Sequence, residues 1–180
     1  MMNTEQTYIQ SANEQLTAFE EHYQYDVSYL QEILAASPEA MQAFDQFKAM
    51  GAFRRKLSPE AYFVANIATM QTEDCGSCLQ LVVKMALEAG VSSEIVRGAL
   101  NKGAGLSTEL ELLHLFSVGV ATNNLVDGLQ EQISELFGKE ALVEIALCIA
   151  ASRVYPSLKR ALGYAGKSCS LVQIEVQERN

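Results

Sequence analysis

Apolar residues recur every three or four positions along most of the chain, which is the spacing of amphipathic helices. The clearest case spans residues 4–36, where the opposite face carries Glu14, Gln15, Glu21 and Glu32. This pattern predicts one long amphipathic helix over residues 4–36. The apolar stripe of this helix consists of Ala12, Leu16, Phe19, Tyr23, Val27, Leu30 and Leu34.

Every proline of the chain falls where a helix is expected to begin. The segments 37–40 and 58–61 both read Ser-Pro-Glu-Ala, a serine cap followed by proline at the first helical position. Pro156 is expected to begin the last helix, which ends near Tyr164. The sequence therefore predicts an all-α fold. Further helices are expected over 37–51, 58–71, 72–89, 92–103, 107–122 and 127–137, and from 138 onward.

Two segments bear on assembly. The helix over 107–122 is apolar nearly all round, so we expect it at the buried centre of the protein or of an oligomer. Residues 170–180 alternate weakly between apolar and polar, which fits a frayed tail or an arm that pairs in an oligomer. A homo-oligomer is predicted, because one small domain can hardly cover both the 107–122 helix and the stripe within 4–36.

A faint repeat with an offset of 80 aligns residues 57–61 with residues 137–141. Each copy is expected to form a helix, a tight turn and a second helix. Tyr155 takes the place of Cys75 in the second copy, so only the first copy can perform thiol chemistry. We expect a single domain over 1–180. Its parts are an N-terminal helical extension (1–50), a C-x-x-C core (55–125), a second helical repeat (126–165) and a tail (166–180).

Composition excludes several classes of partner. The chain has 180 residues, is 49% apolar and carries a net charge of −9, so neither nucleic acid nor an anionic membrane is an expected partner. The N-terminus has no secretion-signal pattern, and no apolar run approaches the ~20 residues that span a bilayer. A cytoplasmic location is predicted. In that reducing compartment a C-x-x-C pair is redox-active or metal-binding rather than structural.

The C-x-x-C pair, Cys75 and Cys78, follows two possible helix caps, Thr72 and Asp74. Residues three apart share a helix face, so the two sulfurs can touch. The free amides of a helix start favour a thiolate, which is the nucleophilic form of cysteine. These features predict a dithiol that attacks, is oxidised and closes into a disulfide.

No metal site or cofactor is expected. Zinc would need two more ligands as a similar close pair, but the remaining candidates are scattered along the chain. Cys148 lies between apolar neighbours and is predicted to be core, whereas Cys169 is predicted to be exposed and incidental. The scattered candidates are Cys148, Cys169, His22 and His114.

Three features of the sequence occur together: the Ser-Pro-Glu-Ala start, the segment Glu73-Asp74-Cys75-Gly76-Ser77-Cys78-Leu79, and the later segment Glu88-Ala89-Gly90-Val91-Ser92. Through these features the chain resembles the alkylhydroperoxidase D-like, carboxymuconolactone decarboxylase superfamily. The match is good over 55–125 and continues more weakly to 165. The resemblance implies antiparallel helices, a homo-oligomer and a disulfide-forming C-x-x-C pair that reduces small hydroperoxides and is recycled by a dithiol reductant. It assigns the peroxide-reacting role to Cys78, whereas helix-start chemistry favours Cys75.

The chain departs from the redox branch of that superfamily at the proton relay. Phe63 and Val82 stand where the branch has a glutamate and a histidine. Peroxide cleavage needs a proton for the departing oxygen, so other residues would have to replace the relay. Each replacement also has a plainer role, as a helix-dipole partner, a cap or a core histidine. The candidates are Glu60, Glu73, Asp74 and His114.

Three functions compete at this stage. The first is a thiol-dependent hydroperoxide reductase or a related dithiol oxidoreductase. The second is a non-catalytic oligomer that keeps a vestigial dithiol, which the missing relay supports. The third is the lactone-decarboxylating branch of the superfamily, for which the sequence offers no convincing acid–base pair.

Overall fold

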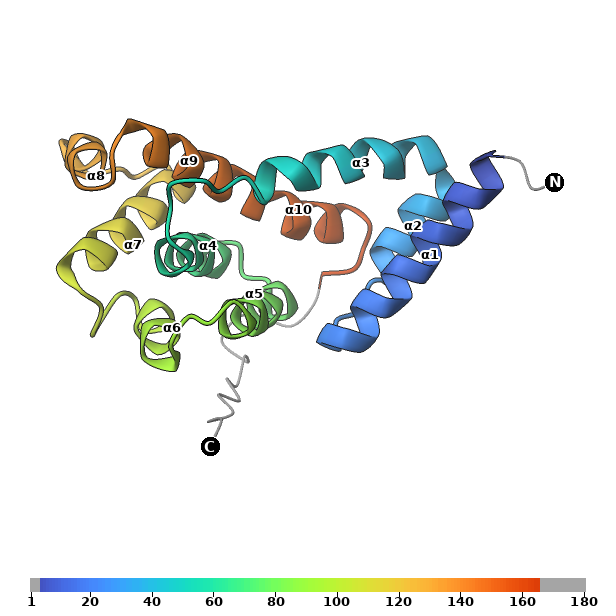
Figure 1. The fold of residues 1–180 in the computed structure, drawn as a ribbon, viewed down its shortest axis with the longest axis horizontal. Helices are drawn as coiled ribbons and strands as arrows, with labels where there is room; N and C mark the ends of the chain where they lie inside the picture. Colours follow the sequence, from blue (N-terminus) through green and yellow to red (C-terminus); the bar gives the residue numbers. More distant parts are fainter. Residues whose placement is uncertain (1–3, 166–180) are drawn as a thin grey trace.

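The computed structural model describes residues 4–165, which form ten helices and no strand (Figure 1), so the predicted all-α fold is confirmed for this range. Cys169 and the alternating stretch near the C-terminus lie outside the described residues. The helices are α1 (Thr4–Tyr23), α2 (Ser28–Ala36), α3 (Pro38–Gly51), α4 (Pro59–Thr72), α5 (Gly76–Glu88), α6 (Ser93–Leu100), α7 (Thr108–Ala121), α8 (Leu129–Phe137), α9 (Lys139–Ser152) and α10 (Val154–Ala161).

The prediction of one continuous helix over 4–36 is wrong, because the chain turns after Tyr23 and forms two helices, α1 and α2. Gln24 has a left-handed backbone with a φ of 50°. The Asp26 carboxylate then accepts a hydrogen bond from the Ser28 N–H at 2.9 Å, and α2 folds back beside α1 (Figure 1). Tyr25 and Val27, within the break, are both buried. Their burial stabilises a turn that helical periodicity alone does not reveal.

Serine caps begin four of the helices, including the two that start with the Ser-Pro-Glu-Ala segments, as the sequence predicts. Each serine hydroxyl accepts a hydrogen bond from the backbone N–H three residues further on, which satisfies a donor that the helix leaves free. Two other starts differ from the prediction: α8 begins at Leu129 rather than Asp127, and α10 begins two residues before Pro156. The capping serines are Ser37, Ser58, Ser92 and Ser107.

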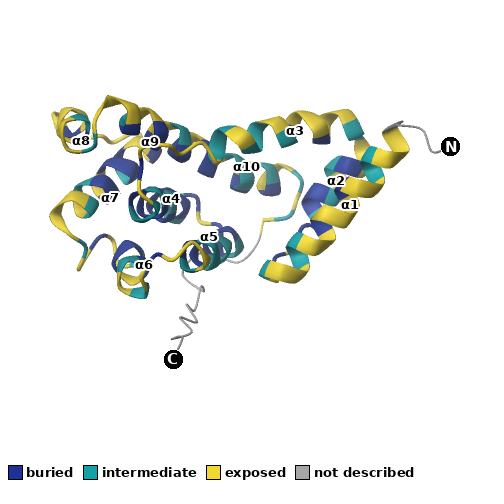
Figure 2. Ribbon diagram, in the orientation of Figure 1, coloured by how far each residue is buried: buried dark blue, intermediate teal, exposed yellow. Residues whose placement is uncertain are grey.

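The central helix is α4, which packs against α5, α6, α7 and α9 (Figure 1). The prediction that the helix over 107–122 would form the buried centre does not hold within one chain. One side of α7 packs on α4, but Leu115 and Val120 on its other side are exposed, by 48% and 37%. The same two helices differ in Figure 2, where α4 is mostly dark blue and α7 is not.

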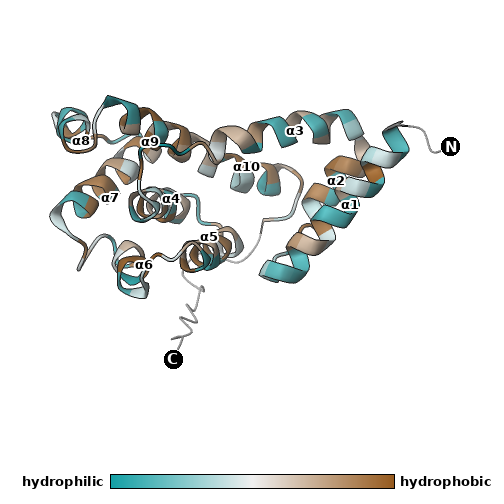
Figure 3. Cartoon of the chain, in the orientation of Figure 1, coloured by the Kyte–Doolittle hydropathy of each residue, from teal (hydrophilic) through white to brown (hydrophobic). Residues whose placement is uncertain are grey.

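The apolar stripe of α1 and α2 is buried within the chain itself. It forms a cluster with Met41 and Phe44 of α3, and Tyr155 and Leu158 of α10 pack against that cluster. Figure 3 shows the brown stretches of α1 and α2, whose outer surfaces are teal. This stripe therefore needs no partner subunit to cover it, which removes one of the two arguments for an oligomer.

Helices α9 and α10 run almost continuously. The stretch Lys139–Ala161 is long and apolar enough, by length and composition alone, to cross a membrane, which corrects the expectation that no such run exists. In the fold its buried face packs into the core, and that face includes the ionisable side chains of Glu144 and Lys159. The expectation of no membrane partner stays a prediction.

Residues 59–72 of α4 and 139–152 of α9 are separated by the offset of 80 that the faint repeat predicts.

Glu144 of α9 holds the loop that leads into α4. Its carboxylate is 2% exposed and accepts hydrogen bonds of 2.9–3.1 Å from the backbone N–H groups of Arg55, Lys56 and Leu57. Burial acts to raise the pKa of Glu144, but these hydrogen bonds outweigh burial and lower it. Glu144 thus ties the loop that precedes the central helix to α9.

Glu144→Gln should lower the free energy of unfolding by about 2–4 kcal/mol, because an amide NH₂ would face backbone donors in a buried site. Since the folded-state pKa is lowered, the Glu144 contribution should be present above the usual carboxyl pKa and lost as the pH falls through the folded-state value. Urea denaturation across pH measures both effects. Glu140→Gln on the same helix is the control, because Glu140 makes only an exposed 3.4 Å ion pair with Lys56. A loss as small as that of this control would contradict the assignment.

Candidate functional site

The two cysteines of the C-x-x-C pair lie at the tight turn between α4 and α5 and form a disulfide. Cys75 is itself the N-cap of α5, and Cys78 lies in the first turn. The predicted caps are wrong: Thr72 is the last residue of α4, and Asp74 has a left-handed φ of 49° in the turn. A three-residue turn leaves the cap position to Cys75.

Both sulfurs are shielded from solvent, since Cys75 is 6% and Cys78 2% exposed. The first turn of α5 contains no acidic residue, so its amides act on the sulfurs without an opposing charge from that turn. After reduction, this position at a helix start favours a thiolate over a thiol. The two Cα atoms are 5.3 Å apart, within the usual range for a disulfide, so the pair can close without a large backbone movement.

Glu73, a predicted relay candidate, is held by two arginines rather than by the dithiol. Its carboxylate accepts hydrogen bonds from Arg153 Nε at 2.7 Å and Arg160 Nη2 at 2.6 Å, and its carbonyl accepts one from Arg160 Nη1 at 2.8 Å. Burial acts to raise the pKa of Glu73, but the two guanidinium groups outweigh burial and lower it. Glu73 therefore stays ionised and fixes α10 against the turn that carries the cysteines.

This attachment of α10 brings Lys159 to the dithiol. Lys159 Nζ donates to Ser77 Oγ at 3.0 Å and lies 3.5 Å from Tyr25 Oη. Ser77 Oγ is 3.7 Å from Cys75 Sγ, and Tyr25 Oη is 3.9 Å from Cys78 Sγ. A single ammonium group is thus connected to each sulfur through one intervening hydroxyl.

The surroundings of Lys159 are aromatic. The side chain is 3% exposed, and its ammonium lies 4.7 Å from the ring centre of Tyr25 and 5.2 Å from that of Tyr29, distances typical of cation–π contacts. Burial lowers the pKa of Lys159, and the negative charge of Asp26 opposes this effect. Burial also raises the pKa of Tyr25 to about 12, so Tyr25 keeps its phenolic proton near neutral pH.

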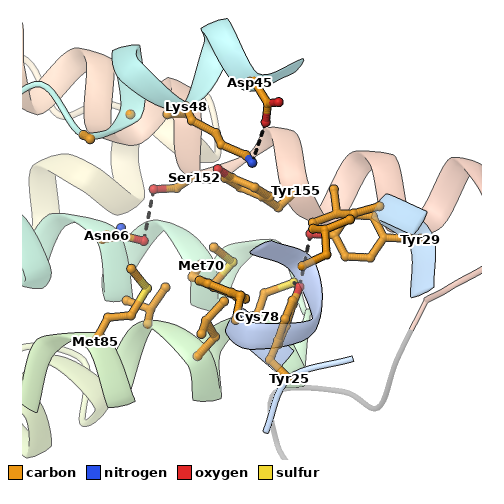
Figure 4. Close-up of a pocket in the computed structure, with 18 of the residues that line it drawn as sticks. Tyr25, Tyr29, Asp45, Lys48, Asn66, Met70, Cys78, Met85, Ser152 and Tyr155 are labelled. Carbon is orange, nitrogen blue, oxygen red and sulfur yellow. Dashed lines mark hydrogen bonds and ion pairs between the residues drawn. The ribbon is translucent and has the colours of Figure 1, made fainter. Parts of the chain in front are cut away.

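A cavity of about 400 Å³ opens beside Cys78, which forms part of its wall (Figure 4). Side chains from α1, α2, α3, α4, α5, α9 and α10 surround it, and most of them are aliphatic, aromatic or methionine. Its few polar groups include Asp45 and Lys48, which form a 2.6 Å ion pair, and Asn66, which accepts a hydrogen bond from Ser152. Cys75 is not among the lining residues.

The structure does not bring the remaining relay candidates to the dithiol. Glu60 lies in the first turn of α4, at the end opposite to the cysteines, about 18 Å away along the helix axis. His114 is buried and pairs with the carbonyl oxygen of Ala99 at 3.1 Å; burial lowers its pKa, which favours the neutral ring. Asp74 is adjacent to Cys75 in sequence but is exposed in the turn.

The two positions where the superfamily pattern has its relay are buried beside the cysteines. Phe63 and Val82 are each 6% exposed and belong to the same apolar cluster as Cys75 and Cys78. Val82 also lines the cavity. The chain therefore keeps these positions next to the sulfurs but fills them with side chains that cannot transfer a proton.

No cluster of metal-ligating side chains occurs among residues 4–165. Cys148 is a buried free thiol, as the sequence predicts, and its sulfur donates to the Tyr62 carbonyl oxygen at 3.7 Å. Burial raises the pKa of Cys148 to about 12, so it stays a neutral thiol in spite of lying at the cavity wall.

Sequence reasoning missed Tyr25, Ser77 and Lys159. One signal was available for Lys159, which shares a helix face with Tyr155 and Leu162 and is a lysine within an otherwise apolar stripe. Tyr25 lies in the unpredicted break between α1 and α2, so nothing in the pattern pointed to it. Ser77 is one of the two residues between the cysteines, and the C-x-x-C spacing by itself gives it no role.

Comparison with known families matches residues 38–117 to the carboxymuconolactone decarboxylase family. The matched segment begins with the first residue of α3, includes the dithiol and ends within α7. Tyr25 and Lys159 lie outside it. No curated protein and no solved structure matches the chain.

Proposed function

We propose that this chain, whose residues 38–117 match the carboxymuconolactone decarboxylase family, is a thiol-dependent hydroperoxide reductase. One observation carries the proposal. Cys75 and Cys78 form a bonded pair, and Cys78 also lines the wall of a cavity large enough for a small organic molecule. A dithiol that only stabilised the fold would not need a sulfur at a cavity.

The proposed reaction uses both cysteines. The Cys78 thiolate attacks the terminal oxygen of the hydroperoxide, the O–O bond breaks, and the alcohol leaves while Cys78 becomes a sulfenic acid. Cys75 then attacks the Cys78 sulfur, water leaves, and the disulfide forms. The two electrons come from the dithiol, and an external dithiol reductant restores it by thiol–disulfide exchange. A cytoplasmic location would supply such a reductant.

The lining of the cavity favours an organic hydroperoxide over hydrogen peroxide. Phe19, Met41, Met70 and Met85 offer apolar surface that an alkyl or aryl group would bury, at roughly 25 cal/mol for each Å² removed from water. Hydrogen peroxide would gain nothing from these contacts. We therefore expect a lower KM for substrates with an apolar group.

The alternative is a non-catalytic family member with a vestigial dithiol. Its support is that Phe63 and Val82 occupy the positions of the usual relay. It predicts that the dithiol reacts with peroxides no faster than an ordinary thiol does.

Treatment of the reduced protein with one equivalent of cumene hydroperoxide should convert Cys75 and Cys78 to a disulfide within seconds. Mass spectrometry should show the loss of two hydrogens in the peptide that holds both cysteines. Cys148 and Cys169 should stay free and serve as internal controls. Oxidation of Cys169 before the pair would favour the vestigial alternative.

A homo-oligomer remains part of the proposal, and its support is a set of exposed apolar side chains on α7, the loop after it, α8 and α9. Of the large apolar side chains exposed in the described part of the chain, all but Phe53 lie between residues 115 and 143. A second copy of this chain would remove them from water. They are Leu115, Val120, Leu125, Val126, Leu136 and Val143.

The double variant Val126→Glu, Val143→Glu should shift the protein to monomers at micromolar concentration, because it would place charges inside the interface. Sedimentation velocity measures the change. Phe53→Glu is the matched control, since Phe53 is exposed by 41% outside this surface, and it should keep the wild-type mass. A monomeric wild type would refute the interface.

A further inference from the structure

We infer that Lys159 is the positioning residue of a substitute proton relay, in which Tyr25 serves Cys78 and Ser77 serves Cys75. Lys159 has two roles in this relay. Its positive charge stabilises each thiolate in turn, and its ammonium group donates the proton that the departing oxygen takes. The proton-donor part rests on the proposed hydroperoxide chemistry, whereas the charge part needs only the reduced dithiol.

The geometry supports two branches from one ammonium group. Lys159 Nζ is 3.0 Å from Ser77 Oγ and 3.5 Å from Tyr25 Oη, and these hydroxyls are 3.7 and 3.9 Å from the two sulfurs. The sulfur atoms observed are those of the disulfide, so each stands in for the thiolate at nearly the same place after reduction. The branches join different cysteines, which allows each to be removed separately.

The charge balance around Lys159 supports the same assignment. Among the described residues no carboxylate forms an ion pair with Lys159, although the side chain is 3% exposed. Glu73, on the adjacent turn, is occupied by Arg153 and Arg160. A buried ammonium that lacks an anionic partner is costly, so burial favours neutral Lys159 while both cysteines are protonated. When Lys159 takes a cysteine proton, the thiolate left behind is the anionic partner of the new ammonium. The site is therefore arranged to favour the ionised dithiol.

The relay balances the protons of the proposed reaction. The Cys78 thiol gives its proton through Tyr25 to neutral Lys159, and the alkoxide that leaves the broken O–O bond takes that proton back by the same route. The Cys75 thiol then gives its proton through Ser77 to Lys159. The hydroxide that leaves Cys78 takes it as water when the S–S bond forms. Lys159 ends each cycle as it began.

Other groups around Lys159 set the pH range. Tyr25 and Asp26 face it from the segment between α1 and α2, Tyr29 faces it from α2, and Tyr155 lies on its own helix. The tyrosines stay neutral near pH 7 because burial raises their pKa values, and Asp26 is ionised because hydrogen bonds with Ser28 lower its pKa. The charge of the reduced site is thus set by the cysteines and Lys159, whose pKa burial lowers.

The test compares Lys159→Met, which removes the charge at similar length, with Lys159→Arg, which keeps it. The reduced full-length proteins are alkylated with iodoacetamide across pH, and mass spectrometry follows Cys75 and Cys78 separately. Lys159→Met should raise the midpoint pH of alkylation by about one unit or more at both cysteines, which corresponds to a tenfold loss of thiolate. Cumene hydroperoxide reduction at pH 7 should slow at least tenfold, while Lys159→Arg should restore the midpoint.

Two further variants separate the branches and keep the test valid if Lys159→Met fails to fold. Tyr25→Phe should raise the midpoint of Cys78 alone, and Ser77→Ala that of Cys75 alone. A well-folded Lys159→Met protein with wild-type midpoints overturns the inference, as do branch variants that leave both midpoints unchanged. The wild type could fail to consume peroxide while its alkylation midpoints still shift in Lys159→Met. That result would refute the proposed function and the proton-donor role of Lys159, but it would support the role of its charge.

Discussion

Cys78→Ser should abolish hydroperoxide reduction, with a loss of kcat/KM on the order of a thousandfold or more. The reason is that Cys78 is the sulfur at the cavity wall, so Cys75 cannot reach the bound substrate in its place. Consumption of cumene hydroperoxide, coupled to a dithiol reductant, measures the loss. Cys169→Ser is the control and should keep wild-type activity, because Cys169 has no part in the proposed reaction.

Cys75→Ser should give a different result from Cys78→Ser. Cys78 can still attack the hydroperoxide once, but no resolving thiol remains, so its sulfenic acid should persist and then oxidise further to the sulfinic acid. Mass spectrometry should find the added oxygen atoms on Cys78. If Cys75→Ser is inert and Cys78→Ser is over-oxidised at Cys75, the roles of the two cysteines are reversed and the helix-cap position decides the nucleophile.

The sequence was enough to locate the dithiol, because its signals are local. A C-x-x-C pair at a helix start, serine caps and a superfamily resemblance all depend on neighbouring residues. The same reasoning placed Cys148 in the core and was wrong about the caps, since the N-cap is Cys75 itself. A tight turn of three residues shifts the helix start by one position, which is finer than periodicity can resolve.

The relay could not be predicted, because its parts are brought together by tertiary packing. Glu73 pairs with Arg153 and Arg160, and these pairs hold α10 against the turn that carries the cysteines. This position of α10 allows Lys159 to reach Ser77. Tyr25 reaches Cys78 only because Gln24 breaks the predicted helix. The sequence offers candidates such as Glu60 and Asp74, whereas the structure brings the Tyr25 hydroxyl from the N-terminal part of the chain and the Lys159 charge from the C-terminal part.

The cavity is also a product of tertiary packing, because side chains from seven helices line it. Its volume leads to a prediction about the size of the substrate. Ala151 of α9 is 4% exposed and lines the cavity, whereas its neighbour Ala150 is exposed to solvent and does not line the cavity. A benzene molecule fits a cavity of about 150 Å³, so a phenyl ring at position 151 would take a large share of the roughly 400 Å³ present here.

Ala151→Phe should therefore raise the KM for cumene hydroperoxide at least tenfold and leave the rate with hydrogen peroxide within about twofold, because the smaller oxidant can still reach Cys78. Filling a cavity with apolar volume should not lower the thermal midpoint by more than a few degrees, provided the ring enters the open space. Ala150→Phe is the matched control on the same helix and should leave both substrates unaffected. If Ala151→Phe slows both substrates equally in a folded protein, the ring has displaced the dithiol. If it slows neither, the cavity is not the route by which organic hydroperoxides reach Cys78, and an approach from the side of Cys75 takes its place.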